Sequence, residues 1–354
     1  MSQPEVICEK QGAAGLIRLN RPQALNALTL GMVREMSRAL DVWEDDPQVA
    51  CVVVTGEGGK AFSAGGDIRL LHDQGRAGDH AAQIAFWREE YVLNRRIKLY
   101  PKPYVAMIDG IVMGGGAGVS INGSHRIAGD KFAFAMPEVG IGFFPDIGAT
   151  WFLPRLPGKT GLYLGLTGAR AKAGDAVALG LAEAYVPSGQ FEALRAALIA
   201  GEPVEAAVKR YSAPPPASAI LGERGVIDDA LAGASVAECL ARLDAAAGGG
   251  SAFAAETAKT IRSKSPTSLA IAFRQMRLGG AMDIDEAMRT EFRIVSRLCR
   301  GHEFYEGVRA VILDKDNAPR WSPASVAEVD EAVVDAYFAP LPASDELAFP
   351  ARGA

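Results

Sequence analysis

Apolar residues in the first half of the chain gather in short runs separated by turn-forming residues. Residues 5–10 and 15–20 are two such runs joined by the turn-forming segment 11–14, which predicts an antiparallel strand pair. Continuous apolar runs at 51–56 and 104–110 predict buried strands, and each of them leads into a glycine-containing loop. Strands therefore account for much of this half.

Helical repeats separate these strand signals. Thr29 is a suitable N-cap, and the apolar residues after it recur at spacings of three and four, which predicts a helix. Residues 80–98 predict a second helix, and short strand-like pieces follow at 125–130 and 132–138. Strands that alternate with helices favour an α/β or closely related layered fold.

The pattern becomes mainly helical after about residue 200. The proline-rich stretch 212–219 cannot be continuous helix, and 245–252 is expected to be a flexible connection. Three further helices are expected, one opening at Ser265 and Pro266, one through 284–298 with Gly301 as its C-cap, and one with the apolar residues of 326–337 on one face. The sequence thus predicts a core, residues 1–204, and a helical C-terminal region, residues 205–354.

Composition and charge exclude several classes of protein. The 354 residues are 49% hydrophobic and 22% charged, which excludes a disordered or collagen-like chain. The net charge of −5 argues against non-specific attraction to nucleic acid or anionic lipid. No secretory signal and no run of about 18 apolar residues is present. The four widely spaced cysteines are typical of free thiols, so we expect a cytoplasmic protein without a membrane span.

Two glycine-rich loops could supply backbone N–H groups to a ligand. The segment 60–68 contains Gly65 and Gly66, and the segment 108–118 contains the triple glycine 114–116. Two such loops facing one another would form an oxyanion hole, worth about 3–4 kcal/mol per donor in acyl chemistry. For either loop alone, tight packing is the more frequent reason for such glycines. Neither loop has Walker A or Rossmann spacing.

Two acidic residues lie in the very apolar stretch 134–156. Glu138 and Asp146 stand eight residues apart among phenylalanine, isoleucine and proline residues. Burial would raise the pKa of such carboxyls towards the range useful for general base catalysis. The alternative is that Glu138 caps a turn after Pro137 and that Asp146 caps the following helix. Both interpretations remain open from the residues alone.

Other candidate chemistry receives less support. The four histidines share no metal-ligand spacing, and no GxSxG motif is present, so neither a metal site nor that type of serine hydrolase is predicted. The pair Glu89 and Glu90 is most simply a solvated helix face.

At the segments just described the sequence resembles the crotonase (enoyl-CoA hydratase/isomerase) superfamily. The matching motifs are NRPQALNAL (20–28), KAFSAGGDI (60–68), the MGGG turn (113–116) and MPEVGIGFFPD (136–146). Within it the chain is similar to the 3-hydroxyisobutyryl-CoA hydrolases over nearly its whole length, and least so at about 205–255. Shared segments include 88–94, 143–156, 264–275 and 300–323.

This resemblance implies a fold and a set of site residues. The fold would be a core of stacked ββα units, with acyl-CoA bound across it and the helical C-terminal region covering the site. The N–H groups of Gly66 and Gly115 would hold the thioester oxygen. Gly118 stands where hydratases carry the first of two glutamates, whereas Glu138 and Asp146 fit the hydrolase pattern. Glu90 matches a substrate-contacting position.

The function expected from the resemblance is hydrolysis of 3-hydroxyisobutyryl-CoA, or a close 3-hydroxyacyl-CoA, in valine breakdown. Glu138 would act as nucleophile or as general base, Asp146 would orient the water or the 3-hydroxyl, and Glu90 would help to fix that hydroxyl. No metal or redox cofactor is required. Expected partners are the acyl-CoA substrate, without nucleic acid or membrane, and a homo-oligomer stays open. The alternatives are an enoyl-CoA hydratase or isomerase and a CoA- or RNA-binding scaffold.

Overall fold

The computed structural model describes residues 3–349. The chain forms two compact units, each assembled from three separate stretches of sequence. Within the described residues, the first unit comprises 3–67, 93–135 and 170–221, and the second comprises 68–92, 136–169 and 222–349. The units are thus interleaved along the chain. The predicted functional division after residue 204 stays a prediction.

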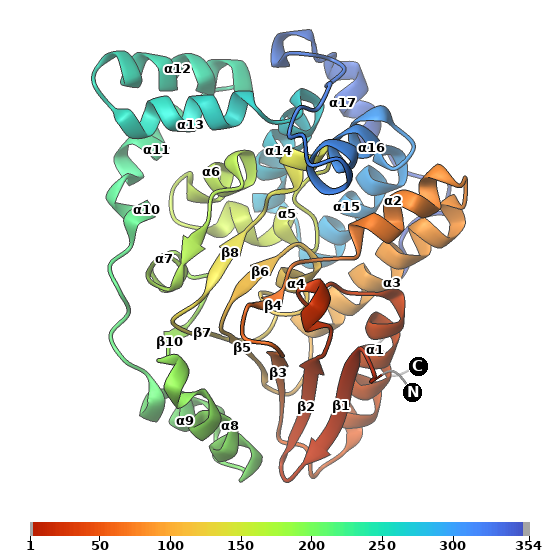
Figure 1. Ribbon diagram of the computed structural model, residues 1–354, viewed down its shortest axis with the longest axis vertical. Coiled ribbons are helices and arrows are strands. Elements are labelled where there is room, and N and C mark those ends of the chain that lie inside the picture. Colours follow the sequence, from red (N-terminus) through yellow and green to blue (C-terminus); the bar gives the residue numbers. More distant parts are fainter. Residues whose placement is uncertain (1–2, 350–354) are drawn as a thin grey trace. The chain divides into compact units, whose positions relative to one another are not determined.

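The first unit contains two sheets (Figure 1). The larger has the strand order β1-β2-β3-β5-β7-β10, in which β1 pairs antiparallel with β2 and all other neighbours are parallel. Its strands are β1 (Val6–Gln11), β2 (Ala14–Leu19), β3 (Cys51–Gly56), β5 (Tyr104–Ile108), β7 (His125–Ala128) and β10 (Ala184–Tyr185). The predicted strands at 5–10, 15–20, 51–56 and 104–110 are therefore confirmed, because each lies in this sheet.

The second sheet of this unit carries the loops of chemical interest. Its order is β4-β6-β8-β9, with parallel pairs between β4, β6 and β8 and an antiparallel pair between β8 and β9. The strands are β4 (Ala61–Ser63), β6 (Ile111–Met113), β8 (Ala133–Ala135) and β9 (Ala171–Lys172). The glycine-rich segments follow directly after β4 and β6, so parallel pairing brings their ends to the same edge of the sheet.

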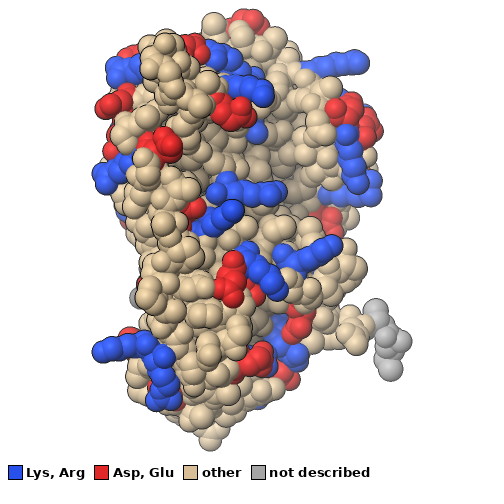
Figure 2. Space-filling view, turned by 60° about the vertical axis from the view of Figure 1, so that its left-hand side comes forward, with Lys and Arg blue, Asp and Glu red and all other residues tan. Residues whose placement is uncertain are grey.

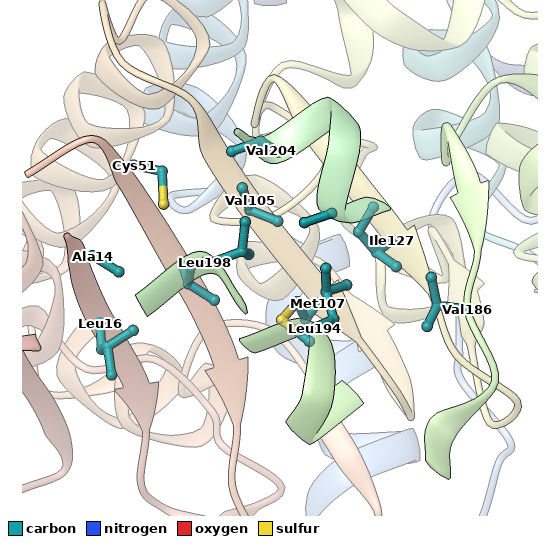
Figure 3. Packing of buried hydrophobic residues seen from close by; sticks show 12 residues of the cluster. Ala14, Leu16, Cys51, Val105, Met107, Ile127, Val186, Leu194, Leu198 and Val204 are labelled. Atoms are coloured by element: carbon teal, nitrogen blue, oxygen red, sulfur yellow. The ribbon is translucent and has the colours of Figure 1, made fainter. Parts of the chain in front are cut away.

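Helices cover the larger sheet and close its core. Buried side chains of β2, β3, β5 and β7 meet those of two C-terminal helices of the unit, α8 (Phe191–Ile199) and α9 (Val204–Tyr211) (Figure 3). Leu194 and Leu198 of α8 and Val204 of α9 are nearly or fully buried in this cluster. A sheet buried in this way explains why β3 and β5 read as continuous apolar runs.

The remaining helices of the first unit include the one predicted after Thr29. The Thr29 hydroxyl accepts a hydrogen bond from the Met32 N–H (3.3 Å) and caps α1 (Leu30–Asp45), as predicted. The others are η1 (Pro22–Ala24), α4 (Gly115–Gly118), α7 (Ala173–Leu179) and η4 (Ser188–Gln190). Helix α3 (His80–Lys98), which was also predicted, is divided between the units: its residues up to Val92 belong to the second unit and the rest to the first. In α10 (Ala219–Gly222), the residues up to Leu221 belong to the first unit.

The second unit is helical. Besides the first part of α3, it contains α2 (Ile68–Arg76), η2 (Glu138–Ile141), α5 (Ala149–Phe152), η3 (Leu153–Arg155), α6 (Thr160–Thr167), α11 (Arg224–Ala230), α12 (Val236–Gly248), α13 (Ala252–Arg262), α14 (Pro266–Leu278), η5 (Gly279–Ala281), α15 (Ile284–Leu298), α16 (His302–Val308), the π-turn η6 (Arg309–Leu313), η7 (Val326–Glu328) and α17 (Glu331–Phe338). Ser265 caps α14 through the Ser268 N–H (3.2 Å), as predicted.

Three local expectations in this unit were wrong. Residues 245–248 belong to α12, so the connection to α13 is only a short turn at 249–251. Gly301 does not cap α15, which ends at Leu298; it precedes α16 in extended backbone. The stretch 326–337 is not one helix, because an extended segment separates η7 from α17. The first two expectations rested on glycines, which also occur inside and before helices, and the third rested on apolar spacing that is compatible with both structures.

Charges of both signs are interspersed on the face of the molecule shown in Figure 2. Among residues 3–349, no helix is both long and apolar enough to cross a bilayer.

Candidate active site

The two glycine-rich loops lie side by side within the first unit. Gly65 has a φ of +114°, a conformation that favours glycine, and follows β4. A Cβ atom built on it would lie 3.7 Å from the backbone nitrogen of Gly115 and 3.6 Å from the Cα of Gly114. These are van der Waals distances, so the two loops are direct neighbours, and the positive φ of Gly65 is what favours glycine there.

Gly66 and Gly115 have N–H groups that secondary structure does not use. Gly66 forms an isolated parallel bridge with Leu28, in which the Gly65 carbonyl accepts from Leu28 N–H (2.8 Å) and Asp67 N–H donates to the Leu28 carbonyl (2.9 Å). The Gly66 N–H lies between these bonds and points to the other side of the extended chain. Gly115 is the first residue of α4, where N–H groups have no partner within the helix. Two donors suited to one oxyanion thus come from adjacent loops.

A buried asparagine packs against α4 at Gly118. A Cβ atom at Gly118 would lie 2.4 Å from Oδ1 of Asn94 and 3.0 Å from its Nδ2. Asn94 is fully buried on α3. Glycine is thus required at position 118 as the chain is packed, and a glutamate side chain could not be placed there without displacing Asn94. The resemblance identified Gly118 as a departure from the hydratase pattern, and this contact gives the physical reason.

The three predicted carboxylates belong to the second unit and are all buried. Glu90 lies on α3, Glu138 begins η2, and Asp146 lies in the loop between η2 and α5; their exposed fractions are 2%, 6% and 4%. The Tyr91 hydroxyl donates a hydrogen bond to Oδ2 of Asp146 (2.8 Å). Within the described residues, Oε1 of Glu90 and Oε2 of Glu138 are buried without a hydrogen-bond partner. Such atoms are costly unless a water or ligand meets them.

Burial raises the pKa of each of these carboxyls. Desolvation is the largest cause for Glu138 and Glu90, and in both the negative charge of Asp146 adds to it. The pKa of Asp146 is raised by desolvation as well, while the hydrogen bond from Tyr91 opposes the rise. Burial and the neighbouring negative charge thus both favour the protonated form of these carboxyls. Strongly perturbed carboxyls of this kind cluster at functional sites.

A second pair of side chains holds the loop that carries Asp146. Both carboxylate oxygens of Glu291, on α15, accept backbone hydrogen bonds, from Gly148 N–H and Thr150 N–H (2.8 Å each). Gln275, on α14, donates to the Pro145 carbonyl (3.0 Å). Burial raises the pKa of Glu291 to about 8, against the effect of the two N–H donors.

The backbone between these anchors is strained. Ile147, directly after Asp146, has a φ of +57°, which is unfavourable for a β-branched residue. A strained residue that is held by its surroundings beside a buried acid is typical of functional sites. The anchors Glu291 and Gln275 thus oppose relaxation of this loop.

The unit that holds the carboxylates also contains an aromatic cluster. Trp87 of α3 stacks on Phe143 with ring centroids 5.6 Å apart, and Phe143 stacks on Phe144 at 4.7 Å. Phe304 of α16 packs against both Trp87 and Phe143. These rings are buried, so they form an apolar part of the core of this unit.

Two interpretations left open by the sequence are now decided. Asp146 does not cap α5: Gly148 is the N-cap residue, and the Asp146 carboxylate pairs with Tyr91. The prediction that Glu90 lies on a solvated face was wrong, because its side chain is buried. Among residues 3–349, no three acidic, histidine or cysteine side chains are arranged to hold a metal ion.

Sequence reasoning missed Tyr91, Asn94, Gln275 and Glu291. A signal existed for Glu291, because a charged residue stands beside Phe292 on the apolar face of a helix. Tyr91 and Asn94 lie in the 88–94 segment that carries part of the family resemblance. Gln275 is the last residue of the shared segment 264–275, so it carries the same kind of signal.

The first unit thus carries a pair of backbone N–H donors, and the second unit carries a set of buried carboxylates; each of these features is typical of acyl-transfer or hydration sites. Residues 14–338 match the family model described as enoyl-CoA hydratase/isomerase, and the chain belongs to this family, within the crotonase superfamily. It is 45% identical to the 3-hydroxyisobutyryl-CoA hydrolase, mitochondrial, of Xenopus laevis, over 95% of this chain and 89% of that protein.

Two solved structures with a similar fold carry enzyme names that differ from the name of the curated relative above. A carnitinyl-CoA dehydratase from Mycobacterium thermoresistibile is 41% identical, with a TM-score of 0.93 and coverage of 99% of this chain and 100% of that one. An enoyl-CoA hydratase from Rhodobacter sphaeroides 2.4.1 is 42% identical, with a TM-score of 0.91 and coverage of 98% and 100%. The predicted α/β crotonase fold is thus confirmed.

The expectation of a cytoplasmic protein is contradicted by these comparisons. Curated relatives that are 41–45% identical to this chain are named as mitochondrial proteins. The expectation rested on free cysteines and on the lack of a secretory signal or membrane span. These features do not distinguish the cytoplasm from other compartments.

Proposed function

We propose that this protein hydrolyses the thioester of 3-hydroxyisobutyryl-CoA, or of a close 3-hydroxyacyl-CoA, to the free acid and CoA, and that it serves valine catabolism. The observation that carries the proposal is the buried pair Glu138 and Asp146, with one Glu138 oxygen left without a partner. The names of the curated relatives support the same substrate class.

The proposed chemistry uses the N–H pair and the carboxylates on one thioester. Gly66 and Gly115 would donate to the carbonyl oxygen as it gains negative charge. In the general-base route, Glu138 takes a proton from water while the water oxygen bonds to the carbonyl carbon. The C–S bond then breaks, and the proton passes to the CoA thiolate. Asp146, held by Tyr91, would orient the water or the 3-hydroxyl, and Glu90 would contact the substrate.

In the alternative route, Glu138 is the nucleophile. Its carboxylate oxygen bonds to the carbonyl carbon, the thiolate leaves, and the resulting anhydride is hydrolysed by water. Turnover in ¹⁸O-labelled water distinguishes the routes. Label in the Glu138 side chain, which mass spectrometry of its peptide detects, establishes the nucleophilic route with attack of water on the glutamyl carbonyl of the anhydride; the general-base route leaves that side chain unlabelled.

A hydratase is the second candidate, because similar solved structures carry hydratase and dehydratase names. Two glutamates around a water would be expected for that reaction, and this chain has glycine at position 118, where the resemblance places the first of them. The proposal therefore favours hydrolysis over hydration.

The test is release of free thiol from 3-hydroxyisobutyryl-CoA and from crotonyl-CoA, measured side by side with a chromogenic thiol reagent. We expect rapid release from the hydroxy substrate, and a loss of about 10²–10⁴-fold in turnover in Glu138→Gln. Glu256→Gln, on an exposed helix face, is the matched control and should be unaffected. Loss of crotonyl absorbance without thiol release would instead establish a hydratase, and near-normal turnover in folded Glu138→Gln would disprove the mechanism.

A further inference from the structure

Asn94 is a buried amide without a protein partner. Its side chain is fully buried, and within residues 3–349 neither Oδ1 nor Nδ2 makes a hydrogen bond. A native structure rarely leaves both ends of a buried amide unpaired, because each end loses its hydrogen bonds to water. The group therefore indicates a bound water or ligand.

A second buried amide beside α4, that of Asn122, differs from Asn94 because it has a hydrogen-bond partner. Asn122 is also buried, but its Nδ2 donates to the Gly118 carbonyl (2.9 Å), which ties it to α4 as a structural group. Asn94 lies over the Cα of the same glycine and makes no such bond. Its packing against α4 is thus accompanied by an unused donor and an unused acceptor.

Asn94 packs against the same short helix that begins with the candidate oxyanion donor Gly115. Gly118, which it contacts, is one turn along α4 from Gly115, and both belong to the first unit together with Asn94. In a 3-hydroxyacyl group the hydroxyl is only two carbons from the carbonyl carbon, so an acyl group whose carbonyl oxygen is held by Gly115 N–H would carry its hydroxyl within about one helical turn of that residue. A hydroxyl group on that chain both donates and accepts, and so matches the unpaired Oδ1 and Nδ2.

We propose that Asn94 is a specificity residue that hydrogen-bonds the hydroxyl group of the acyl chain. This rests on the proposed function, because it assigns one feature of the 3-hydroxyacyl substrate to one side chain. A site built to bind a hydroxyl rejects an analogue that lacks it, since the buried polar atoms are then left unpaired. Asn94 thereby distinguishes hydroxyacyl from plain acyl thioesters.

The experiment compares kcat/KM for 3-hydroxyisobutyryl-CoA and isobutyryl-CoA in the wild type and in Asn94→Leu. We expect the variant to lose roughly ten- to hundredfold on the hydroxy substrate and to keep its rate on isobutyryl-CoA within about twofold. Asn122→Leu is the matched control: it should lower thermal stability and leave the ratio of the two rates unchanged. Asn94→Ala provides the same comparison if the leucine variant does not fold.

Two results would overturn the proposal. An unchanged ratio in the folded variants would show that the hydroxyl is bound elsewhere. An equal loss on both thioesters would show that Asn94 holds a water or supports the fold. If the wild type hydrolyses neither thioester, the proposed function fails, and calorimetric binding of the same two compounds to the wild type and Asn94→Leu decides the role of Asn94 by the same ratio.

Discussion

Glu291 gives the sharpest test of how the second unit positions Asp146. Its two oxygens accept the N–H groups of Gly148 and Thr150 at 2.8 Å, and the side chain is fully buried. Replacement by leucine leaves both donors buried and unpaired. Each costs about 1–3 kcal/mol, so we expect Glu291→Leu to lower the free energy of unfolding by roughly 2–6 kcal/mol.

Glu291→Gln separates the two hydrogen bonds. Glutamine keeps one acceptor oxygen, so the expected loss falls to roughly half, about 1–3 kcal/mol. Activity should fall in both variants, because the strained backbone at Ile147 can relax and move Asp146. Mispositioning of a reacting group by about 1 Å can cost on the order of 10²-fold in rate.

Urea unfolding followed by circular dichroism, with thiol release as the activity assay, checks both expectations. Glu286→Gln on the same helix is the control, because its side chain is exposed and a change there should stay within about 0.5 kcal/mol. If Glu291→Leu were as stable and as active as this control, the role of Glu291 as an anchor would be refuted.

Three further predictions follow from the buried groups. Burial holds the pKa of Glu90 well above 4.5 in the folded protein, so this carboxyl lowers the free energy of unfolding as pH rises. Glu90→Gln should therefore raise the thermal midpoint more at about pH 8 than at about pH 5. An equal change at both pH values would contradict this. Gly118→Ala should destabilise by about 1–3 kcal/mol, because its Cβ would lie 2.4 Å from Asn94 Oδ1; an unchanged urea midpoint would show that Asn94 can move freely. Since Glu138 must be ionised to act and burial beside Asp146 raises its pKa, the rate of thiol release should rise with pH through a range above that of an ordinary carboxyl, and a flat profile from about pH 5 upwards would contradict it.

The sequence itself was sufficient to predict many of the elements and to select the first candidate groups. Apolar runs at β3 and β5, the Thr29 cap and the Ser265–Pro266 helix start depend on neighbours within a few residues, so local patterns predict them. The motifs around Gly66, Gly115, Glu138 and Asp146 identified the family, because their order along the chain is specific even where each alone is weak.

Only the tertiary structure decided how those groups are held. The burial of Glu90, the Tyr91 bond to Asp146 and the two N–H groups on Glu291 depend on segments 50 or more residues apart. Apolar spacing likewise did not reveal that 326–337 is interrupted or that Asn94 occupies the space over Gly118. The physical reason is that hydrophobic periodicity shows which face of an element is buried, whereas desolvation, hydrogen-bond partners and pKa depend on what the rest of the chain packs against that face.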